Sequence, residues 1–147
     1  MLAENSSSAH ARQGARDLLV RALYQWQIGG HEHDELLEQF AAEPDFSRID
    51  KRYFRELLAS VLENAERLDS VIRDEGGRNL NTVDAIGRAV LLLGLEELNS
   101  RSDVPPKVVI NEAVELAKRY GPPDCYRFVN AILDNVAKKS GQGIGGD

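Results

Sequence analysis

Apolar residues recur every three or four positions along most of the chain, which is the spacing of an amphipathic α-helix. The first such stripe ends at Gly29 and Gly30, a pair of residues that typically stops a helix. A short second helix is expected to end before Pro44. A long third helix is expected to open at "SRID", residues 47–50, where Ser47 and an acid match a capping box. The apolar faces of these three helices are, in order, Ala15, Leu19, Ala22, Leu23 and Trp26; Leu36, Leu37 and Phe40; and Tyr53, Phe54, Leu57, Leu58, Val61, Leu62, Ala65 and Leu68.

Three further helices are predicted in the second half of the chain. Thr82 can cap a fourth helix, whose run "AVLLLGLEEL" is apolar nearly all round and therefore suits the buried centre of a bundle. A fifth helix is expected from about Pro105 to Tyr120, where basic residues, Gly121 and two prolines form a stop signal. Asp124 can cap a sixth helix. Its apolar face is Phe128, Val129, Ile132, Leu133 and Val136.

No run of alternating β-branched residues predicts a strand. The pattern therefore predicts an all-α fold, a compact bundle of six to seven helices. A length of 147 residues suits one domain, which we place at residues 11–139. Residues 1–10 are expected to be a disordered N-terminal tail, and residues 140–147 a flexible C-terminal tail.

The predicted cellular location is the cytoplasm. Residues 1–10 lack the basic region and apolar core of a signal peptide. No stretch reaches the ~18 uninterrupted apolar residues that indicate a membrane span. Cys125 is the single cysteine, so no intrachain disulfide can form, which suits a reducing compartment.

The charge of the chain is unevenly distributed. It holds 24 acidic and 18 basic residues, a formal net charge of −6. Residues 31–75 contain 13 acids and 6 bases, a balance of −7, so the two ends of the chain are close to neutral or slightly positive. This distribution permits a small basic patch and excludes a general polyanion-binding surface.

No motif of known catalytic or metal-binding chemistry is present in the sequence. A phosphate-binding G-x-x-x-x-G-K-[ST] loop, G-x-G-x-x-G, H-E-x-x-H and G-x-S-x-G are all missing. Three histidines and one cysteine do not make a closed zinc set. Glu96 and Glu97 are neighbours, so on a helix their side chains diverge by ~100°. We therefore predict no catalytic residue, no metal ligand and no cofactor, and nothing here indicates an enzyme.

The first helix carries an arginine-rich polar strip beside its apolar face. Arg12 and Arg16 lie one turn apart on the same side, with Gln27 on the adjoining flank and Tyr24 slightly further round. Guanidinium groups match phosphate oxygens, and a tyrosine ring can stack with a base. Arg21 points away from this strip. The alternative is that the arginines are ordinary solvated charges and that Tyr24 is half-buried packing.

Several blocks of the sequence, in the right order, resemble the NusB family. They are "ARQGARDLLVRALYQWQ", "YFRELLASVLENAERLDSVI", "DVPPKVVINEAVELAKRYG" and "DCYRFVNAILDNVAKK", and together they extend over about residues 11–138. The resemblance implies a NusB-like helical fold. It also implies a transcription antitermination factor that binds the boxA segment of nascent ribosomal RNA transcripts and promotes their transcription. Its expected partner is NusE, the ribosomal protein that doubles as a transcription factor, within the antitermination complex of RNA polymerase.

The same resemblance assigns RNA contacts to two segments, the first helix and the start of the last one. For Phe128, packing in the core is an almost equal alternative to contact with RNA. The positions carried over from the family are Arg12, Arg16, Tyr24 and Gln27, followed by Asp124, Arg127 and Phe128.

This chain departs from the family pattern at four positions. Gln13 and Gly14 stand where further basic residues are common, Leu92 where an arginine is frequent, and Glu96 where an aromatic residue is common. Fewer cations neutralise fewer phosphates, and two arginines would give a salt slope of about −1.4 on single-stranded RNA. We therefore expect the chain alone to bind RNA weakly and to depend on its partner.

Two other interpretations remain open at this point. The chain could be a NusB-like scaffold or interaction protein with weakened or lost RNA binding. It could also be the NusB-like domain of a ribosomal RNA cytosine methyltransferase, although such an enzyme needs a downstream catalytic domain. The sequence leaves monomer and homodimer undecided, and the NusE-binding surface is expected on the fourth and fifth helices.

Overall fold

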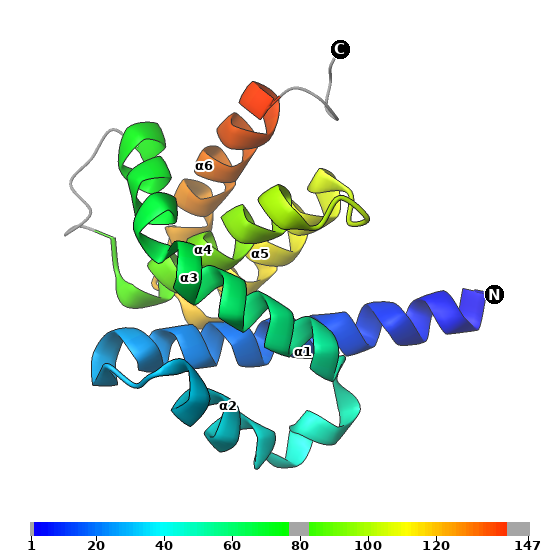
Figure 1. Cartoon of the computed structure of the whole chain (residues 1–147). Helices are drawn as coiled ribbons and strands as arrows, with labels where there is room; N and C mark the ends of the chain where they lie inside the picture. The colour runs from blue at the N-terminus through cyan, green and yellow to red at the C-terminus, as the bar shows by residue number, and fades with distance from the viewer. Residues whose placement is uncertain (1, 77–82, 141–147) are drawn as a thin grey trace. The chain divides into compact units, whose positions relative to one another are not determined.

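The computed structural model describes residues 2–76 and 83–140, and over these ranges its regular elements are all helices, without a strand (Figure 1). This confirms the predicted all-α fold. None of the helices in the described ranges is both long and apolar enough to cross a membrane. The elements are α1 (Leu2–Gly29), α2 (His33–Ala41), the 3-10 helix η1 (Pro44–Arg48), α3 (Lys51–Gly76), α4 (Ala85–Ser100), α5 (Pro106–Tyr120) and α6 (Cys125–Ser140).

The chain divides into two compact units with their boundary inside α3. The first unit is residues 1–63 and the second is residues 64–147. The predicted single domain over residues 11–139 stays a prediction.

The first unit is built on the apolar stripe of α1 and an aromatic cluster. Ala15, Leu19, Ala22 and Leu23 are fully buried, as predicted, while Trp26 is only half-buried. Phe54 of α3 is the centre of the cluster. The ring of Phe46 from η1 packs edge-on against it at 5.7 Å, and that of Phe40 from α2 lies 6.3 Å away.

The helix α1 begins at Leu2, within the segment for which the sequence predicts a disordered tail. Residues 2–13 contain no glycine or proline, and Leu, Ala and Glu favour helix, so nothing in this segment interrupts the helix. Ser8, Ala9 and His10 are exposed, which means that the helix extends beyond its buried stripe. The other predicted tail, residues 140–147, lies outside the described residues except for Ser140, which ends α6.

Two helices are capped by a residue that lies later in the chain than the predicted cap. The N-terminus of α3 is capped by Asp50, whose Oδ1 accepts a hydrogen bond from the Tyr53 N–H at 3.0 Å. Ser47 is inside η1 instead, because this 3-10 turn occupies the residues expected to form the capping box. The cap of α4 is Asp84, which accepts from the Gly87 N–H at 2.8 Å. The predicted cap, Thr82, lies outside the described residues.

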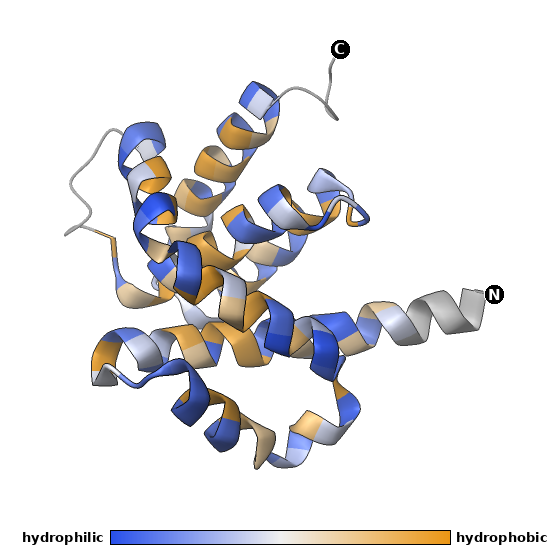
Figure 2. Ribbon diagram, viewed as in Figure 1, coloured by the Kyte–Doolittle hydropathy of each residue, from blue (hydrophilic) through white to orange (hydrophobic). Residues whose placement is uncertain are grey.

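In the second unit, α4, α5 and α6 each pack against the other two. Residues 91–97 of α4 are all buried, which confirms the prediction of a buried fourth helix. Gly94 permits a close approach, since a Cβ there would lie 2.9 Å from Leu133 Cδ1 of α6. Arg88 of α4 forms a bidentate pair with Asp69 at 2.9 and 2.6 Å. Figure 2 shows that apolar and polar residues alternate along α6, as expected of a helix with one buried face.

Candidate nucleic-acid interface

The residues predicted to contact RNA fall into two groups, one in each unit. The groups are Arg12, Arg16, Tyr24 and Gln27 on α1 of the first unit, and Asp124, Arg127 and Phe128 at the start of α6 in the second.

Arg12 is a partly exposed cation held against an aromatic ring. Its Cζ lies 4.4 Å from the ring centroid of Tyr53, and its Nε is 3.7 Å from Asp50 Oδ2. The side chain remains 31% exposed. Cation–π contact and a weak ion pair therefore restrict the guanidinium while leaving part of it open to a phosphate.

Arg16 faces the same ring from one turn further along α1, but it is buried. Only 3% of the residue is exposed, and its Cζ lies 5.5 Å from the Tyr53 centroid. Its Nη2 donates to the Tyr53 hydroxyl at 3.5 Å. The structure thus confirms that the two arginines share one side of α1, and it shows that Arg12 is the accessible one. Sequence periodicity could not reveal this, because the covering residue is 37 positions away in the chain.

The C-terminal half of α1 presents an exposed aromatic residue. Tyr24 is 41% exposed, and Ile28, one turn later, is 66% exposed. Gln27 is half-buried, and its Nε2 donates to the Leu23 carbonyl at 3.3 Å. Arg21 pairs with Glu43 at 3.2 Å, and its position on the helix turns it away from Arg12 and Arg16, as predicted. Ile28 was not among the predicted residues, although its spacing of four from Tyr24 places it on the same face.

In the second group, Asp124 and Arg127 form an exposed charged pair. Asp124 Oδ1 lies 3.4 Å from Arg127 Nε, with side chains 77% and 72% exposed. Asp124 adopts a left-handed conformation with a φ of 70°, which aspartate tolerates better than most residues, and its side chain faces Arg127. The Arg127 Nε also donates to the Tyr126 hydroxyl at 3.2 Å. That hydrogen bond, with a smaller contribution from the Asp124 carboxylate, raises the pKa of Arg127.

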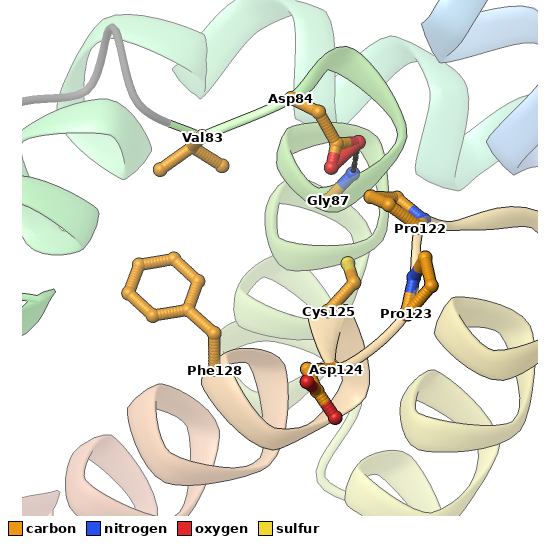
Figure 3. A pocket seen from close by; sticks show the side chains of 8 residues that line it. All are labelled: Val83, Asp84, Gly87, Pro122, Pro123, Asp124, Cys125 and Phe128. Atoms are coloured by element: carbon orange, nitrogen blue, oxygen red, sulfur yellow. Dashed lines mark hydrogen bonds between the residues drawn. The ribbon is translucent and has the colours of Figure 1, made fainter.

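Phe128 forms one wall of a pocket of about 360 Å³ (Figure 3). Its ring is half-buried, so it is neither a core residue nor a fully exposed platform. The other walls come from the residues before α4 and from the connection between α5 and α6, which explains why no local motif indicated the pocket. The lining residues besides Phe128 are Val83, Asp84, Gly87, Pro122, Pro123, Asp124 and Cys125.

The floor of this pocket combines a glycine and a thiol. A Cβ at Gly87 would lie 3.3 Å from both Cys125 Sγ and Asp84 Oδ2, so the glycine keeps this side of the pocket open. Burial, with a smaller contribution from the Asp84 charge, raises the pKa of Cys125 to about 11. The thiol is therefore protonated near neutral pH and acts as an apolar wall rather than as a nucleophile.

Two of the departures from the family pattern lie in the interior. Leu92 is fully buried and Glu96 is 2% exposed. Glu96 Oε1 lies 3.9 Å from Nη2 of Arg67, whose side chain is much more exposed than that of Glu96. Neither position therefore supplies a cation to the surface. Within the described ranges, no group of three or more His, Cys, Asp or Glu side chains is arranged to hold a metal ion.

Comparison with known proteins identifies the NusB family. The model of the NusB family matches residues 13–138. The transcription antitermination protein NusB of Serratia proteamaculans is 46% identical over 127 residues, which cover 86% of this chain and 92% of that protein. The structure of T. maritima NusB has a TM-score of 0.77 at 32% identity, covering 87% of this chain and 91% of that one. A structure of antitermination factors NusB and NusE in complex with double-stranded RNA has a TM-score of 0.71 at 26% identity, covering 88% and 98%.

Proposed function

The chain belongs to the NusB family of transcription antitermination proteins, and we propose that it binds the boxA segment of nascent ribosomal RNA transcripts together with NusE. The observation that carries this proposal is that each group of predicted residues holds an at least partly exposed arginine, Arg12 or Arg127, against the ring of a neighbouring tyrosine. A NusB relative has been solved with NusE and RNA, which supports both ligands for a protein of this fold. The complex would join RNA polymerase in the cytoplasm and promote transcription of ribosomal RNA.

In the first unit, we assign the phosphate contact to Arg12 and the base contact to Tyr24. Arg12 is partly exposed and already oriented by Tyr53, so it loses little side-chain freedom when it binds a phosphate. Tyr24 offers an exposed ring that can stack with a base. Arg16 would act as a positioning residue, because it supports Tyr53 from the buried side. Gln27 lies beside this face, where its amide can hydrogen bond to RNA.

In the second unit, Arg127 would contact a phosphate and Phe128 would contact a base. Arg127 is exposed and charged, which suits a phosphate. The half-buried ring of Phe128 and the adjoining pocket suit the apolar face of a base, and a volume of about 360 Å³ can admit one. Asp124 can accept hydrogen bonds from the amino group of a base, which would add sequence preference.

A scaffold that binds NusE without RNA is the second candidate function. It is favoured by the small number of accessible cations on α1, where Arg16 is buried and Gln13 and Gly14 carry no charge. A scaffold would bind its protein partner equally well after the loss of Arg12.

The two functions are separated by anisotropy of a labelled boxA RNA, titrated with the protein and NusE. We expect Arg12→Ala to weaken RNA binding several-fold and to leave binding of NusE unchanged. Arg48→Ala is the matched control, because Arg48 is a paired, exposed arginine of the same unit that lies outside the predicted site. Absence of boxA binding by the wild-type protein, with NusE binding intact, would select the scaffold.

A further inference from the structure

Two cations from different helices lie beside the ring of Tyr126. Lys118 belongs to the last turn of α5, and its Nζ is 5.0 Å from the ring centroid. Arg127 belongs to the first turn of α6, with its Cζ at 5.6 Å from the same centroid. Its Nε also donates to the Tyr126 hydroxyl at 3.2 Å. Both cations therefore contact the half-buried ring of Tyr126, and all three residues belong to one unit.

The surroundings of Tyr126 are exposed and slightly positive. The side chains of Lys118 and Arg127 are 51% and 72% exposed. Each of these two cations lies beside one carboxylate: Glu115 is 4.0 Å from Lys118 Nζ, and Asp124 is 3.4 Å from Arg127 Nε. Ion pairs this exposed contribute little, so an incoming phosphate can displace them. Arg119 adds a third cation at the same helix end.

We propose that Tyr126, Lys118 and Arg127 form a subsite for one further nucleotide of single-stranded RNA, beyond those bound at Phe128 and on α1. A base stacks on the Tyr126 ring. The Lys118 ammonium group then leaves the ring and forms an ion pair with an adjacent phosphate. This inference rests on the proposed RNA-binding function and extends it, since neither Tyr126 nor Lys118 belongs to the predicted site.

The ring is what favours a nucleotide over an acidic protein segment as the ligand. A carboxylate-rich segment would use the cations alone, whereas a nucleotide uses both the cations and an aromatic face. The subsite shares Arg127 with the proposed site, so the two lie at the same end of α6.

The test is RNA binding by the full chain with NusE, measured on boxA RNA extended by several nucleotides at both ends. Tyr126→Leu should weaken binding about ten-fold, which is within the range of one lost base stack, while Tyr126→Phe should stay close to wild type. A series of RNAs, each lacking one base, locates the contact. At one position the missing base should weaken the wild type and have no further effect on Tyr126→Leu.

Salt dependence tests the phosphate half of the subsite. Lys118→Gln should reduce the slope of log K against log salt by about 0.7, the value for one phosphate contact on a single strand. Lys138→Gln is the matched control and should leave the slope unchanged. Lys138 is an exposed, paired lysine at the opposite end of α6.

Failure of the subsite and failure of the proposed function give different results. Wild-type affinity in Tyr126→Leu, with binding still weakened by Arg12→Ala, would overturn the subsite alone. Loss of NusE binding in Lys118→Gln with no effect of Tyr126→Leu would also overturn it, in favour of an acidic protein ligand. Absence of boxA binding by the wild type would overturn both. Thermal unfolding of each variant shows that the protein compared is folded.

Discussion

The two arginines of α1 should separate into one that stabilises the fold and one that binds RNA. Arg16 is 3% exposed, and Arg12 keeps 31% of its side chain exposed, although both contact Tyr53. We expect Arg16→Ala to reduce the free energy of unfolding more than Arg12→Ala does, and Arg12→Ala to affect RNA binding more than Arg16→Ala does.

The magnitudes follow from burial. A desolvated cation–π contact is worth about 2 kcal/mol, and the lost hydrogen bond and packing of the Arg16 stem add about 1 kcal/mol. For Arg12, an exposed cation–π contact of about 0.5–1 kcal/mol and an ion pair with Asp50 of about 0–1 kcal/mol give a total near 1 kcal/mol. The difference between the two variants is therefore about 2 kcal/mol.

Urea unfolding and RNA titration test the two halves of this prediction. With an m-value of about 2 kcal/mol/M, the unfolding midpoint of Arg16→Ala should lie about 1 M urea below that of Arg12→Ala. Arg12→Ala should lower the salt slope of boxA binding by about 0.7, and Arg16→Ala should leave it unchanged under conditions where it is folded. Equal midpoints, or a reduced slope in Arg16→Ala, would refute this division of roles.

Three further variants or conditions test the second unit. Gly94→Ala should destabilise by about 1 kcal/mol in urea unfolding, because overpacking against Leu133 (about 1–3 kcal/mol) exceeds the gain in helix propensity (up to about 1 kcal/mol); a stabilised variant would show that the contact is not tight. Asp84→Ala removes the cap of α4 and should cost about 1 kcal/mol by the same assay, whereas an unchanged midpoint would contradict the capping role. The Cys125 thiol, with its pKa raised to about 11 from an ordinary value of 9.0, should alkylate slowly at pH 9. Because the thiol ionises at lower pH in the unfolded chain than in the folded one, the contribution of the protonated thiol to stability is complete below pH 9 and is lost between about pH 9 and 11. Alkylation at the rate of a free thiol at pH 9 would contradict the raised pKa.

The helices could be predicted from the sequence because each carries its own apolar periodicity. The stripe through Ala15 and Leu23 and the buried run of α4 required no knowledge of their neighbours. The helix starts were less predictable, since Ser, Thr and Asp are all good caps and several occur close together. At α3 the choice between Ser47 and Asp50 was decided by a short 3-10 turn that leaves little trace in periodicity.

The candidate site was predictable only where it depends on one helix. The spacing of Arg12 and Arg16 placed both on one side of α1, but their different burial depends on Tyr53 of another helix. Likewise, Phe128 was predicted, whereas its pocket is lined by residues up to 45 positions away, such as Val83. Contacts between distant segments depend on tertiary packing, which a single sequence does not display.

Recognition of boxA RNA by this protein together with NusE can be tested by competition between two RNAs. Labelled boxA RNA bound to the protein and NusE should be displaced by unlabelled boxA at far lower concentration than by a scrambled RNA of equal length. Binding should also be tighter with NusE than without it. Equal displacement by both RNAs, or no complex in the presence of NusE, would contradict recognition of boxA by this protein.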